Sequence, residues 1–160
     1  MQREMPLFLS THTNKIDKKG RVSVPAQFRS ALADQSFQGL VLFRSNSYEC
    51  LEGFAWSYMQ ELSERLDDFD FFSSEQDNLA TAIFSEAIQL PLDGDGRIIL
   101  PDHLISFACL DVQVSFVGLG LKFQIWSPEK FFQRREEARS IVKSEGLTIP
   151  QVKKSLGAER

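Results

Sequence analysis

Short apolar runs separated by turn residues recur along most of the chain, a pattern typical of a β-rich fold with a few helices. Strands are predicted at residues 39–44, 48–51, 112–117 and 121–126. Helical spacing of apolar residues predicts helices at residues 54–66 and 128–142 and a connecting helix within residues 67–87. Together these elements predict an α+β fold.

One ten-residue segment occurs twice and organises the chain as an internal repeat. The first copy is IDKKGRVSVP at residues 16–25, and the second is LDGDGRIILP at residues 92–101. A strand-like run, a second short run and a long helical stretch follow each copy. We therefore predict a first unit at residues 7–66, a connecting helical segment at 67–87, a second unit at 88–143 and a mobile C-terminal tail at 144–160.

The residues of the repeated segment indicate a turn followed by a helix. An Asp side chain can accept hydrogen bonds from backbone amides two residues further on, and Gly adopts a positive φ at no steric cost. Pro25 and Pro101 are predicted to end the second strand of each copy and to lie in the first turn of the next helix. Each unit is thus expected to run strand, turn, short strand, short helix, hairpin and helix.

The net charge of −4 by itself argues against a nucleic-acid partner, but the charges are unevenly distributed. Residues 1–40 contain six Lys and Arg against three Asp and Glu, whereas residues 41–90 contain two Arg against ten acids. A basic surface at the N-terminal end therefore remains available to DNA, with the acidic middle directed elsewhere.

Several other functions lack the residues they would need. No apolar run is long enough to span a membrane, and the polar N-terminus does not resemble a signal peptide, so we expect a cytoplasmic protein. Cys50 and Cys109 are expected to be reduced, semi-buried thiols, with no zinc motif around them. No nucleophile elbow, P-loop or dinucleotide fingerprint occurs, so we expect neither an enzyme, a metal site nor a cofactor.

The doubled segment resembles the MraZ family of bacterial regulators, and the resemblance extends from residue 7 to about residue 143. It rests on DKKGRVSVPAQFR from Asp17 onward and on DGDGRIILP from Asp93 onward. It implies two tandem AbrB-like swapped-hairpin β-barrel units in a pseudo-twofold arrangement with flanking helices, assembled as a homo-oligomeric ring. It also implies a nucleoid-associated protein that binds double-stranded DNA at direct repeats, usually to repress the division and cell-wall gene cluster that includes its own gene.

The candidate DNA-binding residues are basic positions in and around the two copies: Lys15, Lys18, Lys19, Arg21, Arg29 and Arg97. All but Arg97 are expected to cluster around the first turn, where a β-ribbon could offer arginine to guanine and lysine to phosphate. A solvated turn without DNA contact is the alternative. Asp93 and Asp95 could hold Arg97 in a structural salt bridge, so its role stays open.

A second hypothesis is that the chain is an antitoxin-like module of the same fold class, whose main partner is another protein. Such a module usually has one motif copy and a disordered acidic tail. Two copies and a basic N-terminal end favour the DNA-binding regulator. The abundant aromatic residues are expected in the core or at subunit contacts, which suggests an oligomer.

Overall fold

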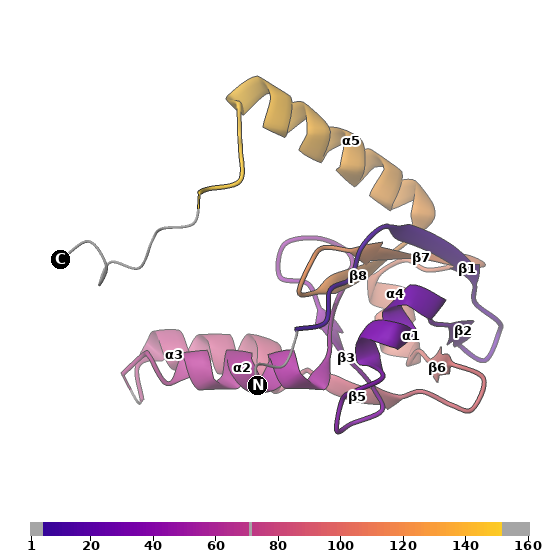
Figure 1. Cartoon of the computed structure of the whole chain (residues 1–160), viewed down its shortest axis with the longest axis horizontal. Coiled ribbons are helices and arrows are strands. Elements are labelled where there is room, and N and C mark those ends of the chain that lie inside the picture. The colour runs from indigo at the N-terminus through magenta and orange to yellow at the C-terminus, as the bar shows by residue number, and fades with distance from the viewer. Residues whose placement is uncertain (1–4, 71, 152–160) are drawn as a thin grey trace. The chain divides into compact units, whose positions relative to one another are not determined.

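The computed structural model describes residues 5–70 and 72–151 (Figure 1). The chain divides into two compact units, residues 1–128 and residues 129–160. The first unit contains every strand and helices α1 to α4, and the second consists of most of helix α5 and the residues after it. The candidate site lies entirely in the first unit.

An antiparallel six-stranded sheet forms the centre of the first unit, with its strands in the order β1-β7-β8-β4-β3-β5. These strands are β1 (Thr11–Lys15), β3 (Gly39–Arg44), β4 (Leu51–Phe54), β5 (Ile88–Pro91), β7 (Gln113–Gly118) and β8 (Phe123–Trp126). A separate two-stranded ribbon pairs β2 (Arg21–Ser23) with β6 (Arg97–Ile99). Figure 1 shows this ribbon beside helices α1 and α4.

Strands of one sequence repeat pair with strands of the other. β1 lies against β7, β2 against β6, β3 against β5 and β4 against β8. The first Asp-x-x-Gly turn does lie between two strands, but these strands do not form a ladder with each other, and the β-bridge between the segments on either side of the turn joins Ile16 and Val22. The two repeats are therefore interleaved, because the strands leaving each turn find their partners in the other copy.

The interleaved strands enclose one apolar core that both repeats share. Phe28 of the first repeat lies at its centre, with its ring 5.3 Å from that of Phe123 and 6.0 Å from that of Phe116 in the second. The Phe8 ring lies 5.1 Å from the Phe28 ring. All four side chains are fully buried. Since burying one large apolar side chain contributes about 1.5–3 kcal/mol, this cluster joins the repeats energetically.

Short helices follow the two turns, and longer ones follow the strand pairs. The helical elements are α1 (Ala26–Leu32), α2 (Trp56–Leu66), α3 (Ser74–Leu79), the π-helical turn η1 (Ala80–Phe84), α4 (Asp102–Phe107) and α5 (Pro128–Glu145). Pro25 and Pro101 occupy the N-cap positions of α1 and α4, one residue before the predicted place. Met59 of α2 joins a second, smaller apolar cluster with Val41, Phe43 and Phe54.

The structure corrects several boundaries and details predicted from the sequence. The strand expected at 48–51 starts only at Leu51, after a turn closed by the Cys50 carbonyl and the Ser45 N–H at 2.9 Å. The connecting helix within 67–87 is α3 continued without a break by the π-helical turn η1, so it covers residues 74–84. Cys50 is buried and Cys109 is exposed, so neither is semi-buried. Helix α5 includes the first residues of the predicted tail, and positions 152–160 of that tail lie outside the described residues.

Gly53 provides a test of the shared core, because its backbone lies directly against the buried Phe123 ring. A Cβ atom at Gly53 would lie 2.3 Å from Cε2 of Phe123. We expect Gly53→Ala to lower the free energy of unfolding by about 1–3 kcal/mol, since an overpacked core forces the ring or backbone to move. Denaturant titration at fixed protein concentration would measure this change.

Gly94→Ala is the matched control for the Gly53 substitution. A Cβ atom there has no neighbour within 4 Å, so the stability should stay close to that of the wild type. Equal stability of the two variants would contradict the tight packing of β4 against β8.

Candidate nucleic-acid interface

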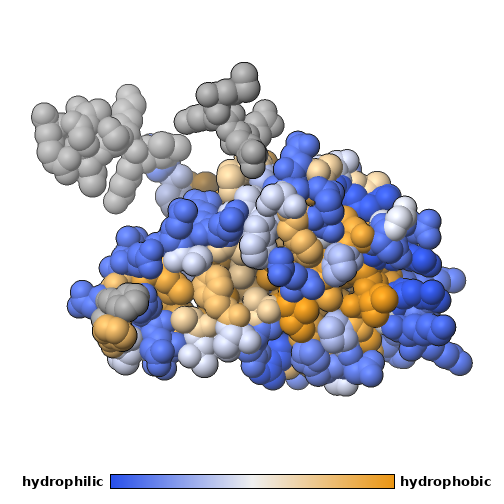
Figure 2. Space-filling view, turned by 90° about the horizontal axis from the view of Figure 1, so that it is seen from below, coloured by the Kyte–Doolittle hydropathy of each residue, from blue (hydrophilic) through white to orange (hydrophobic). Residues whose placement is uncertain are grey.

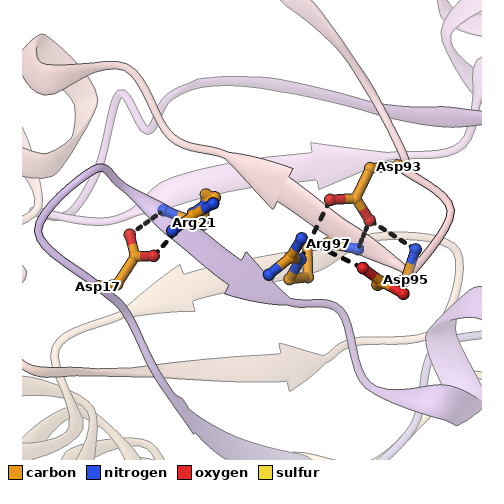
Figure 3. Close-up of polar contacts among 5 residues, drawn as sticks. All are labelled: Asp17, Arg21, Asp93, Asp95 and Arg97. Carbon is orange, nitrogen blue, oxygen red and sulfur yellow. Dashed lines mark hydrogen bonds and ion pairs between the residues drawn. The ribbon is translucent and has the colours of Figure 1, made fainter.

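The first Asp-x-x-Gly-Arg turn is organised by the carboxylate of Asp17 (Figure 3). Its Oδ1 atom accepts hydrogen bonds from the backbone N–H groups of Lys19 and Arg21, each at 2.9 Å. Its Oδ2 atom accepts a hydrogen bond from Nε of Arg21 at 2.8 Å. One side chain thus fixes both the turn backbone and the direction of the arginine.

The second turn repeats this arrangement with one addition. Oδ1 of Asp93 accepts from the backbone N–H groups of Asp95 and Arg97 at 2.8 and 2.9 Å, and Oδ2 accepts from Nε of Arg97 at 3.1 Å. A terminal guanidinium nitrogen of Arg97 also contacts Oδ2 of Asp95 at 3.2 Å. The salt bridges expected from the sequence are therefore present, but Arg21 has one as well.

The hydrogen bonds in the two turns lower the pKa values of both organising carboxyls. For Asp17 the largest cause is the backbone N–H of Arg21, and for Asp93 it is the backbone N–H of Arg97. Both carboxyls therefore stay ionised below their ordinary pKa, and the support they give the turns is lost only as the pH falls through the lowered pKa. At neutral pH both arginines are held in place.

The two turns lie at opposite ends of the β2–β6 ribbon. Val22 and Ile98 face each other across the strands and are each 1% exposed, so this side of the ribbon enters the core. Because side chains alternate along a strand, the neighbouring residues Arg21, Ser23 and Arg97 project from the other side. The ribbon therefore presents both arginines on one outward face.

Each turn is also tied to the strand that leaves the other turn. The Leu100 N–H donates to the Gly20 carbonyl at 2.8 Å, and the Val24 N–H donates to the Gly96 carbonyl at 3.0 Å. Gly20 and Gly96 have φ values of +84° and +75°, which residues other than glycine rarely adopt. The positive φ explains why both copies carry glycine at this position, and at Gly20 a Cβ would also lie only 2.6 Å from the Leu100 carbonyl oxygen.

Arg29 lies at the second turn, not with the first-turn cluster expected from the sequence. A Cβ atom at Gly96 would lie 2.6 Å from Cδ of Arg29. The corresponding neighbour of Gly20 is Ile105, the residue of the second repeat that matches Arg29. The physical reason is the interleaving, which places helix α1 of the first repeat over the turn of the second.

The remaining candidates lie around the first turn as predicted. Lys15 ends β1, and Lys18 and Lys19 form the tip of the turn; all three are exposed. In the second turn Gly94 and Asp95 replace the two tip lysines. The turns therefore share one backbone geometry but differ in charge, with more basic side chains at the first.

Sequence reasoning named the Asp of the repeated turn as an acceptor for backbone amides, but it missed two side-chain contacts that position this surface. It did not place the Arg21 guanidinium on Asp17, although the spacing of these two residues is the same as that of Asp93 and Arg97. The Asn14 side chain donates from Nδ2 to the Ser23 carbonyl at 2.7 Å and links β1 to β2. The repeated four-residue spacing of Asp and Arg was the available signal for Asp17; no repeated feature pointed to Asn14.

The described residues, 5–70 and 72–151, contain no group of three or more His, Cys, Asp or Glu side chains placed to hold a metal ion. Asp93 and Asp95 instead use carboxylate oxygens for the contacts within their turn. No helix in this part of the chain combines the length and apolar character that crossing a membrane requires. The ribbon offers two fixed guanidinium groups, with lysines around the first of them, and these groups suit phosphate and base-edge acceptors.

Comparison with known proteins finds two tandem copies, with bounds that differ from those of the predicted units. Residues 7–81 and residues 83–146 each match the family described as "MraZ protein, putative antitoxin-like". The two matches begin 76 positions apart, the spacing that separates Gly20 from Gly96. Both the repeat and the resemblance inferred from it are thereby confirmed.

Individual relatives match over most of their length. A protein of Gluconobacter oxydans (strain 621H) named Transcriptional regulator MraZ is 46% identical over 139 residues, or 85% of each chain. A protein of the same name from Gluconacetobacter diazotrophicus is 46% identical over 149 residues, covering 91% of this chain and 93% of the relative. One from Rickettsia akari (strain Hartford) is 39% identical over 145 residues, covering 91% and 97%. The chain belongs to the MraZ family.

Proposed function

We propose that this chain is a transcriptional regulator that binds double-stranded DNA through the outward face of the β2–β6 ribbon and its two turns. The observation that carries the proposal is the pair of arginines, Arg21 and Arg97, each oriented by an aspartate on that face. A two-stranded ribbon fits the major groove, where arginine can donate two hydrogen bonds to guanine. The names of the relatives support regulation of transcription.

The strand pairing supports the finer fold implied by the family resemblance, an AbrB-like swapped-hairpin barrel with pseudo-twofold symmetry. The counterpart strands of the two repeats are β1 and β5, β3 and β7, and β4 and β8. If each strand in the order β1-β7-β8-β4-β3-β5 is replaced by its counterpart, the result is the same order read backwards. In such a swapped arrangement the two turns lie at opposite ends of the ribbon and share its outward face. The strands and helices α1 to α4 of the two repeats would then fold as one body.

The distribution of charge supports an approach of DNA to the ribbon and its turns. The first turn contributes Lys15, Lys18 and Lys19, and Arg29 adds a cation beside the second turn. The densest run of acidic residues lies elsewhere, on α2, α3 and their connection: Glu61, Glu64, Asp67, Asp68, Asp70, Glu75 and Asp77. Such a separation steers a polyanion toward the ribbon although the net charge is negative.

We infer a ring oligomer that acts on direct repeats because a single ribbon offers few contacts to phosphate. Linked sites become effectively intramolecular, which raises affinity without any new contact. An apolar surface for contacts between subunits is available: Trp56, Met59 and Phe84 line an open groove between α2 and η1, and Figure 2 shows hydrophobic side chains gathered on one face of the molecule.

Repression of the division and cell-wall gene cluster, and association with the nucleoid, follow from the resemblance. The antitoxin-like alternative would need a protein partner for the same arginines.

Arg21→Ala is the most direct test of the proposed site. We expect a loss of about 1–3 kcal/mol in binding per contacted repeat, because a bidentate base contact disappears. The fold should persist, since the Arg21 side chain is 39% exposed. Gel-shift titration on DNA from upstream of the chain's own gene would measure the affinity, and circular dichroism would verify folding.

Two companion variants define the specificity of that effect. Arg97→Ala should cost less, because two carboxylates already share its guanidinium. Arg65→Ala removes an equally charged side chain from an exposed ion pair on α2 and should leave binding unchanged. A folded Arg21→Ala protein with wild-type affinity would remove Arg21 from the interface.

The assembly makes a separate prediction about the spacing of the repeats. Light scattering should show a species several times the chain mass of 18.2 kDa. Inserting half a helical turn between two repeats should weaken binding by about 10²-fold or more, because the linked contacts can no longer form together. A monomer that binds tightly and tolerates the insertion would contradict the ring mechanism.

A further inference from the structure

One large apolar side chain is exposed on the ribbon face that carries the arginines. Ile99 is 60% exposed, whereas its neighbours in sequence, Ile98 and Leu100, are each 1% exposed. In the β2–β6 register Ile99 lies directly opposite Arg21. Side chains directly opposite each other in an antiparallel pair project from the same face, with Cβ atoms about 4.5–5.5 Å apart. An isoleucine and a guanidinium therefore point outward side by side.

The two ends of the ribbon differ at this position. Ser23 is the first-repeat residue that matches Ile99, and it lies opposite Arg97. Arg21 is therefore paired with an apolar neighbour, and Arg97 with a hydroxyl group. The backbone of the ribbon is nearly symmetric, but the chemistry it presents is not.

We propose that Ile99 contacts the C5-methyl group of a thymine next to the base pair that Arg21 contacts. The inference rests on the proposed function, because it requires the ribbon to lie in the major groove. The thymine methyl is the apolar feature of the base edges there, and apolar side chains recognise it by contact. The basic residues around the first turn complement the charge of DNA and identify DNA, among possible occupants, as the partner of this face.

This asymmetry gives the binding site a direction. Arg21 with Ile99 selects guanine beside thymine, while Arg97 with Ser23 selects a guanine without a required methyl group nearby. A symmetric ribbon would suit a palindrome, whereas an asymmetric one suits sites that all run the same way. The Ile99 contact would therefore select the direct orientation of the repeats.

Replacing thymine with deoxyuridine tests the contact, since it removes only the methyl group. The probe is the duplex from upstream of the chain's own gene that the wild-type protein protects in a footprint, with each thymine replaced in turn. One position in each repeat should lose about fourfold in affinity with the wild type, because burying one methyl-sized group contributes about 0.8 kcal/mol. Ile99→Ser, which copies Ser23, should bind the thymine and uracil duplexes equally.

Leu119→Ser is the matched control, because Leu119 is 47% exposed in the β7–β8 turn and lies outside the ribbon. It should keep the wild-type sensitivity to deoxyuridine. If replacing any thymine with deoxyuridine leaves the affinity of the wild type unchanged while Arg21→Ala still weakens binding, the proposed Ile99 contact is wrong and the proposed function stands. If the wild type binds this duplex no better than unrelated DNA, the proposed function itself fails.

Light scattering distinguishes the remaining explanation of an exposed isoleucine, a contact between subunits. Ile99→Ser should leave the oligomer mass unchanged. A smaller species, with the deoxyuridine effect still present, would assign Ile99 to the assembly and overturn the thymine contact.

Discussion

The pairing of β2 with β6 is the constraint on which the rest of the structure depends. Both strands are only three residues long, so neither repeat could hold its own turn in place by local pairing. Val22 and Ile98 meet across the pair and enter the shared core, and the turns are consequently fixed at the two ends of one ribbon. The same pairing joins the folding of the repeats to the construction of the candidate site.

Each aspartate holds its arginine side chain in place, so that the guanidinium is a fixed hydrogen-bond donor. Asp17 and Asp93 use one carboxylate oxygen for two backbone N–H groups and the other for a guanidinium Nε. The other guanidinium nitrogens of Arg21 make no hydrogen bond within residues 5–70 and 72–151, which leaves them to a ligand. The two repeats therefore share this geometry but differ in the side chains around it, as Ser23 and Ile99 illustrate.

Local features of the sequence predicted local features of the structure. The bounds of β3, at residues 39–44, were predicted to the residue, and the Asp-x-x-Gly segments form turns because their side-chain chemistry acts over four residues. The pairing of β1 with β7 was not derivable in this way, since an alternating pattern does not specify which strand lies alongside. The position of Arg29 depends on that pairing. The prediction that Arg29 lies in the first-turn cluster was therefore wrong, because Arg29 lies beside the second turn.

We propose that both turns of the ribbon face DNA, although they differ in charge and in the side chains beside their arginines. The salt dependence of binding tests this directly, because each phosphate contact contributes about one unit to the log–log slope. Lys19→Ala should flatten the slope by about one unit, and Asp95→Lys, which gives the second turn the lysine of the first, should steepen it by about one unit. An unchanged slope for Asp95→Lys, with the expected loss for Lys19→Ala, would show that only the first turn reaches DNA and would contradict the shared surface.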